Sequence, residues 1–207
     1  MKKNKMQIQN EYIGDDKFKK MLEHYLCPTP LEVIKMKFIG AMCSPNMAIR
    51  PADVISSFWE QGKEPRLETK EEADLFFKFF MGLWDELFEK VKANKVELSK
   101  FKTKDKNQLM ALCNARFEEV ELGYVEGFWG GKEDLNIPAY LAEMVDSLTE
   151  LAGVYKLFAK KLEGLDKAPN DVLEKLIYTD KMVVKAINFI IENHLLPRIN
   201  DVARTLN

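Results

Sequence analysis

The chain has 207 residues and a formal net charge of −2 at pH 7, so it lacks the excess of positive charge that attracts nucleic acid or anionic lipid. Apolar residues make up 46% of the sequence and charged residues 31%, which is the balance of an ordinary soluble globular protein. A chain of this length fits one large domain or two small ones. The composition therefore argues against a nucleic-acid partner.

The cysteines and the N-terminal residues indicate the compartment. Cys27, Cys43 and Cys113 are widely spaced and odd in number, which favours free thiols in a reducing compartment but leaves one disulfide open. Residues 1–10 contain three lysines but not the apolar run of a signal peptide. No apolar run approaches the roughly 20 residues that span a bilayer. We therefore expect a cytoplasmic protein with no membrane partner.

The N-terminal residues predict a flexible tail and a first helix. Residues 1–14 are polar and are expected to form the tail, with a single all-helical domain over residues 15–207. The helix begins at Asp15 or Asp16 and ends before Pro28. Its apolar residues recur at helical spacing: Phe18, Met21, Leu22, Tyr25 and Leu26.

Two further short helices follow. Thr29-Pro30-Leu31-Glu32 is a capping signature with proline at the first helical position, and it predicts a second helix that ends near Cys43. Pro51 begins a third helix that reaches Trp59. Residues 61–68 are polar and are expected to connect it to the next helix.

The densest apolar pattern lies between Thr69 and Val91. Thr69 and Glu72 form a capping box at its start. Leu75 and Phe79 fall outside the main apolar face, so the first half of this helix is apolar nearly all round. We expect it to lie at the centre of the domain. Its main face comprises Ala73, Phe76, Phe77, Phe80, Leu83, Trp84, Leu87, Phe88 and Val91.

A lysine-rich segment, residues 90–106, separates this helix from the next. It is interpreted as a solvated linker, and a basic patch for an acidic partner is the alternative. A fifth helix begins after Thr103 and runs into the glycine-rich residues 127–131. Its apolar side comprises Leu109, Cys113, Phe117, Val120 and Tyr124.

The C-terminal part predicts two long helices. The first spans 138–163 and ends at Gly164, and the second is capped by Asn170 or Asp171 and stops before Pro197, beyond which the chain extends after a kink or frays. Their short connector is typical of antiparallel neighbours. The expected fold is all-α, a single multi-helix bundle of about seven helices with a C-terminal antiparallel hairpin.

No catalytic, cofactor-binding or metal-binding residues are expected. His24 and His194 sit at predicted helix ends, where a cation favours the helix dipole, and neither has a glutamate three residues before it. Cys43-Ser44 is the one pair that suggests a nucleophile, without a partner motif. Most of four glutamates are expected to face water rather than form a site: Glu118, Glu119, Glu121 and Glu126.

Exposed aromatic and aliphatic residues form a candidate interaction surface. Trp59 and Trp129 are either surface anchors or plugs at the edge of a core, and the second role is the commoner one. The full candidate set is Trp59, Leu75, Phe79, Phe128 and Trp129. Val145, Ala152 and Ala159 widen the apolar face of the helix over 138–163, and this surplus favours a homodimer.

Several short motifs resemble those of the YecA/YgfB-like (UPF0149) family of bacterial proteins. They lie within residues 18–192 and comprise Thr29–Glu32, Phe38–Pro45, Pro51–Ile55, Phe58-Trp59 and Gly123–Gly130. Two features differ: residues around Lys35–Lys37 replace a His-Gly pair, and there is no cysteine after Cys113 to form a zinc-binding tail. The resemblance implies an all-helical, cytoplasmic, often dimeric protein with no established reaction.

Three classes of function remain. The first is a protein-interaction or regulatory module with an unidentified protein partner, because core packing explains every strong pattern. The alternative is a helical enzyme or small-ligand-binding protein with a cavity inside the bundle. The third is a structural subunit of an assembly. A deep pocket with convergent polar side chains favours the second class, and a flat apolar patch favours the first.

Overall fold

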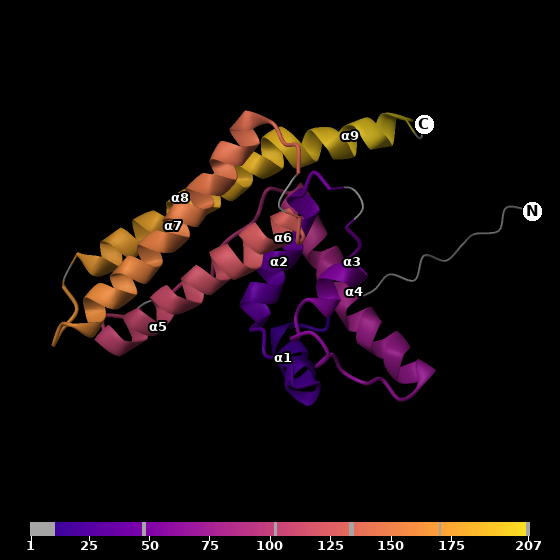
Figure 1. Ribbon diagram of the computed structural model, residues 1–207, viewed down its shortest axis with the longest axis horizontal. Coiled ribbons are helices and arrows are strands. Elements are labelled where there is room, and N and C mark those ends of the chain that lie inside the picture. The colour runs from indigo at the N-terminus through magenta and orange to yellow at the C-terminus, as the bar shows by residue number, and fades with distance from the viewer. Residues whose placement is uncertain (1–10, 47–48, 102, 133–134, 170, 206–207) are drawn as a thin grey trace, which may run out of the picture.

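The computed structural model describes residues 11–46, 49–101, 103–132, 135–169 and 171–205, which form helices and no strand (Figure 1). With each uninterrupted run counted once, these residues form seven helices, so the prediction of an all-α bundle with a C-terminal hairpin is confirmed. The elements are α1 (Asp15–His24), α2 (Leu31–Cys43), α3 (Pro51–Ser56), α4 (Lys70–Lys92), α5 (Lys106–Phe117), η1 (Glu118–Val125), α6 (Glu126–Trp129), α7 (Ala139–Glu163), α8 (Val172–Ile190), η2 (Ile191–Leu195) and α9 (Leu196–Thr205).

The most enclosed helix is α2. Ten of its 13 residues are buried, and it packs against α1, α3, α4, η1, α6 and η2. The expectation that the phenylalanine-rich helix α4 lies at the centre is wrong. Helix α4 buries one face, while Leu75 and Phe77 are exposed on its N-terminal half. The number of aromatic residues in a helix indicates how wide its apolar face is. How deeply the helix is buried depends on how many other helices pack against it.

The buried face of α4 anchors an aromatic cluster. The Phe80 ring is 0% exposed and stacks on Phe58 with ring centroids 5.7 Å apart. The Thr69 hydroxyl accepts a hydrogen bond from the Glu72 amide at 3.1 Å, as predicted. The Glu72 carboxylate accepts from the amide of Glu68 at 2.7 Å, one residue earlier than the capping box predicts.

The backbone of helix α2 lies directly against the backbones of η1 and α6. A Cβ atom on Gly40 would lie 2.1 Å from the carbonyl oxygen of Tyr124, and one on Gly127 would lie 2.3 Å from the carbonyl oxygen of Lys37. Neither position has room for a side chain. Glycines of both sequence motifs therefore allow the close approach of the backbones at this crossing.

The hairpin of α7 and α8 runs along α5 (Figure 1). Helix α7 packs against both α5 and α8, so its buried face is wider than contact with a single helix requires. Val145, Ala152 and Ala159 are buried in this face. The sequence pattern predicts instead that they form apolar surface beyond what the core needs. These residues therefore give no support to a dimer.

The last helix continues past Pro197. Helix α8 runs through the π-helical η2 into α9, so the predicted stop is wrong and the extension is observed. Proline has no amide hydrogen and cannot donate to a carbonyl of the preceding turn. That turn is π-helical, with the Leu196 amide donating to the Ile191 carbonyl. The Tyr140 hydroxyl of α7 donates to the Asn193 carbonyl of the same turn at 3.4 Å.

Several loop predictions need correction. Residues 1–10 of the predicted tail lie outside the described residues, but Tyr12 and Ile13 pack against the core. Leu26 follows the end of α1 with a φ of 49° and is exposed, because the helix ends before its side chain can reach the core. The Thr29 hydroxyl donates to the carbonyl of Phe58 at 2.7 Å and does not cap α2.

The lysine-rich segment after α4 is irregular over 93–101 and 103–105, as expected of a linker. It is not solvated throughout, since Val96 and Leu98 are buried in the core. The cap of α5 is Asp105, whose carboxylate accepts from the amide of Gln108 at 2.9 Å.

Candidate functional site

An open pocket of about 910 Å³ lies between parts of the chain that are distant in sequence. One wall comes from Lys37 in the middle of α2, from the loop that follows this helix and from α3. The others come from η1 and α6 with the glycines after them, and from Thr149 on α7. Its apolar lining comprises Ile49, Val54, Val125 and Trp129. The pocket is therefore mixed in character, with an aromatic wall and polar groups around it.

The π-helical turn shapes one wall. Glu121, Val125 and Trp129 all line the pocket, at intervals of four residues. In an α-helix such residues drift by about 40° per step. A π-helix closes its hydrogen bonds one residue further along and winds more slowly, so the step from Glu121 to Val125 falls short of a full turn. This shortfall offsets the α-helical drift from Val125 to Trp129. The carboxylate and the indole are thus brought onto one stripe that faces the pocket.

The charged residues of the pocket differ in their pairing. Lys37 forms an ion pair with Glu126 at 3.0 Å, and Asp53 pairs with Arg50 at 2.7 Å. Glu121 is half-buried, and its Oε2 is buried without a hydrogen-bond partner in the described part of the chain. The prediction that these glutamates face water is therefore wrong for Glu121.

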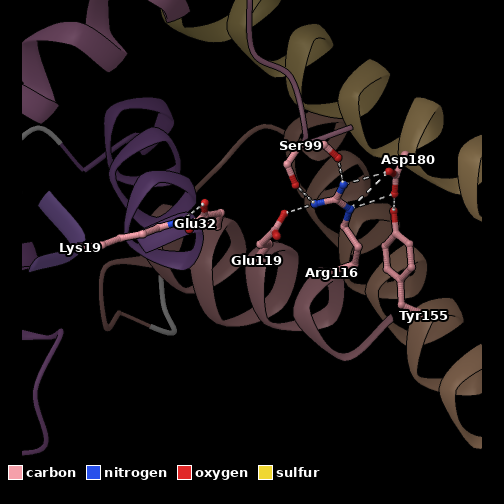
Figure 2. Close-up of polar contacts among 7 residues, drawn as sticks. All are labelled: Lys19, Glu32, Ser99, Arg116, Glu119, Tyr155 and Asp180. Carbon is pink, nitrogen blue, oxygen red and sulfur yellow. Dashed lines mark hydrogen bonds and ion pairs between the residues drawn. The ribbon is translucent and has the colours of Figure 1, made fainter. Parts of the chain in front are cut away.

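A second polar centre is the buried guanidinium of Arg116 (Figure 2). Its Nη1 donates to Glu119 Oε2 at 2.6 Å and to Ser99 Oγ at 3.1 Å, and its Nε donates to Asp180 Oδ1 at 3.3 Å. Its Nη2 donates to the Ser99 carbonyl and to Asp180 Oδ2. The Tyr155 hydroxyl donates to Asp180 Oδ1 at 2.6 Å. All five donors of the guanidinium thus have partners.

Burial and the neighbouring charges act against each other in this centre. Burial opposes the charge of Arg116, but the carboxylates of Glu119 and Asp180 outweigh it and raise the pKa of the guanidinium. Burial raises the pKa of Glu119, against the opposing effect of Arg116. Glu119 is buried, so its predicted water-facing position is also wrong. Because Arg116 is 0% exposed, the centre joins the 93–105 segment, α5, η1, α7 and α8 rather than contacting a ligand.

The cysteines do not supply a nucleophile. Cys43 is 0% exposed, and burial raises its pKa to about 12, against the opposing effects of the Tyr124 hydroxyl and the Arg198 guanidinium. Burial also raises the pKa of Cys113 to about 11, with a further contribution from Asp180. All three cysteines are free. A protonated, enclosed thiol is inert as an attacking group.

The two histidines lie in different surroundings. His24 is exposed at the end of α1, as predicted. His194 lies inside the continuous C-terminal helix, with Nε2 2.9 Å from Nη1 of Arg198, which also donates to the Ser44 carbonyl at 2.7 Å. Burial, and then the Arg198 charge, lower the pKa of His194. The neutral imidazole is favoured, so a role as a cation at a helix end is wrong for this residue.

The five residues of the predicted surface are not brought together. Trp59 is 6% exposed and donates from Nε1 to the Tyr25 carbonyl at 3.1 Å, so it closes the edge of the core. Phe128 is fully buried. Leu75 is exposed and Phe79 half-buried on α4, and Trp129 lines the pocket. Trp129 therefore remains as a site residue, and Leu75 and Phe79 as a separate apolar patch.

Within the described ranges, no group of three histidine, cysteine or acidic side chains is placed to hold a metal ion. In the same part of the chain, no helix is both long and apolar enough to cross a bilayer. No family model, curated protein or solved structure matches the chain, so membership of the YecA/YgfB-like family stays a prediction.

Proposed function

We propose that the protein is a non-catalytic interaction module that holds a segment of a partner protein in the pocket beside Trp129. The pocket itself carries this proposal, because its volume of about 910 Å³ and its open side suit several side chains of an extended segment. Aromatic side chains at such places are frequent anchors of binding.

The chemistry of the pocket supports binding rather than catalysis. Its lining offers carboxylates, lysines, hydroxyls and an indole, while the buried thiol of Cys43 lies outside the lining. Ser57, the one serine of the lining, donates its hydroxyl to the Val54 carbonyl at 2.7 Å. A nucleophile needs a base within hydrogen-bond reach, and this hydroxyl is directed to a backbone acceptor instead.

A small-ligand-binding function is the second candidate. The pocket volume lies within the range of about 300–1,000 Å³ typical of small-molecule sites. Its mixed lining also provides the few placed polar groups that orient such ligands. A pocket-filling variant that abolishes thermal stabilisation by a member of a metabolite collection, without affecting peptide binding, would favour this candidate.

Selection of peptides from a random displayed library, followed by affinity measurement, tests the main proposal. Thr149→Trp fills the pocket from the exposed surface of α7, and Glu150→Trp places the same side chain at the neighbouring exposed position outside the lining. Selected peptides should bind Glu150→Trp like wild type and Thr149→Trp at least about tenfold more weakly, a loss of about 1.4 kcal/mol. Equal binding to both variants would contradict the proposal.

We further propose that the protein is a cytoplasmic homodimer of bacterial origin, as the family resemblance implies. The exposed Leu75 and the half-buried Phe79, four residues apart on α4, support association, because contiguous apolar patches often mark interfaces. Light scattering after size-exclusion chromatography should give twice the 24.0 kDa chain mass. A mass of one chain that does not change with concentration would contradict the dimer.

A further inference from the structure

We infer that the segment held in the pocket presents a cationic side chain, a lysine ammonium or an arginine guanidinium, to Glu121 and Trp129. This inference rests on the proposed function, because it identifies the chemistry of the occupant of the same pocket. It follows from the state of one carboxylate, from the pairing of the charges around it and from the position of the indole.

The Glu121 carboxylate lacks a hydrogen-bond donor, which a cation would provide. Its Oε2 is buried and accepts no hydrogen bond from the described residues, although the side chain lines the open pocket. A buried carboxylate oxygen without a donor is costly, because it has lost water and gained nothing in exchange. An ammonium or guanidinium entering the pocket carries the donors and the charge that this oxygen lacks.

The other charges of the pocket are already paired or lie at its edge. Glu126 holds Lys37, whose side chain is only 14% exposed, and Asp53 holds Arg50. Lys132 lines the pocket but is exposed and forms no ion pair with Glu121 among the described contacts. Glu121 is therefore the carboxylate of this lining that is best placed to bind an incoming cation.

Trp129 adds a second attraction for the same group. The indole is half-buried and lines the pocket on the stripe that carries Glu121 and Val125. The face of an indole ring attracts a cation electrostatically, and tryptophan is the best aromatic for this contact. The apolar Val125 between them suits the methylene stem that both lysine and arginine carry.

Three blocked amino acids serve as probes: Nα-acetyl-lysine methylamide, Nα-acetyl-arginine methylamide and the neutral Nα-acetyl-norleucine methylamide. Binding is followed by the nuclear magnetic resonance shift of the Trp129 indole N–H, assigned with Trp129→Phe. Both cationic probes should shift this signal in a saturable way at low salt. At equal concentrations the norleucine probe should bind at least about tenfold more weakly, since it lacks the charge.

Variants locate the responsible charge. Glu121→Gln should weaken the cationic probes at least about tenfold, whereas Glu126→Gln, which neutralises the neighbouring carboxylate, should change their affinity less than about threefold. Lys132→Gln should leave the affinity unchanged or increase it. A decrease with Lys132→Gln, or equal effects of the two glutamate variants, would overturn the inference.

Two further measurements, thermal melting and the salt dependence of binding, complete the test. Thermal melting shows whether Glu121→Gln is folded; if it is not, the salt dependence of wild-type binding decides, because an ionic contact weakens as salt rises. Salt-independent binding, or norleucine binding as tight as lysine, would overturn the cationic occupant. Peptide binding that remains sensitive to Thr149→Trp would then still support the proposed function, and its absence would contradict both.

Discussion

Whether a residue of this protein is buried depends more on the segments that surround it than on its residue type. Arg116 and Glu119 are fully or almost fully buried because each supplies what the other needs. Leu26, by contrast, is apolar and exposed because α1 ends before it. Helical spacing predicts the face on which a residue lies, but not whether a distant segment covers that face.

Phe80 tests the aromatic cluster on α4. The ring is 0% exposed and lies near the rings of Phe18, Phe58 and Phe76. Phe80→Ala should lower the free energy of unfolding by about 3–5 kcal/mol, because it removes a buried aromatic and leaves a cavity. Urea denaturation measures this loss. A value below about 1 kcal/mol would show that the cluster contributes little.

Asp180 tests the buried ion network. It accepts from both Arg116 and Tyr155, so its removal leaves a buried guanidinium with one carboxylate fewer. Asp180→Ala should cost about 3 kcal/mol in denaturant unfolding. Asp166→Ala, at an exposed position on the hairpin connector, should stay within about 0.5 kcal/mol of wild type. Equal losses at the two positions would contradict the role of the network.

His194 predicts a pH dependence of stability. Its pKa is lowered in the folded protein, so between that value and 6.5 the unfolded chain binds more protons. Its contribution is therefore complete above pH 6.5 and is lost as the pH falls through the lowered value. Unfolding free energies at pH 7.5 and 5.5 should differ less for His194→Gln than for wild type. An equal or larger difference in His194→Gln would refute this assignment.

At the scale of elements, the sequence pattern predicts helices well and their environment less well. Caps, prolines and apolar spacing place the starts of α2, α3, α4 and α7 within about a residue of the observed ones. The pattern fails at Pro197, where the helix continues through a π-helical turn. The pattern also predicts the wrong central helix, α4 instead of α2, because contacts between segments far apart in the chain decide which helix is most buried.

Gly40 tests the close crossing of α2 with η1. A methyl group there would lie 2.1 Å from the Tyr124 carbonyl oxygen, so Gly40→Ala must separate the two helices and should cost roughly 3 kcal/mol. Gly153 on α7 has open space at its Cβ position, and Gly153→Ala should stabilise by about 0.5–1 kcal/mol. Thermal melting compares the two, and a stable Gly40→Ala protein would disprove the close crossing.

At the scale of the whole molecule, the pocket forms where three distant segments meet: α2 with the loop and α3 that follow it, the η1–α6 run, and α7. Trp129 could be predicted as a candidate because tryptophan is rare and follows a helix into a glycine run. Glu121 could not, since its neighbours in sequence indicate a water-facing helix side. Its burial depends on partners from other segments, which no local pattern reports.

Hydrogen–deuterium exchange, with and without a peptide selected for binding, tests the pocket as the binding site most directly. The peptide should slow exchange at the amides of residues 49–57 and 121–132, which form its walls. Slower exchange confined to the apolar patch around Leu75 and Phe79, or to the α7–α8 hairpin, would place the binding surface elsewhere and contradict the proposed function.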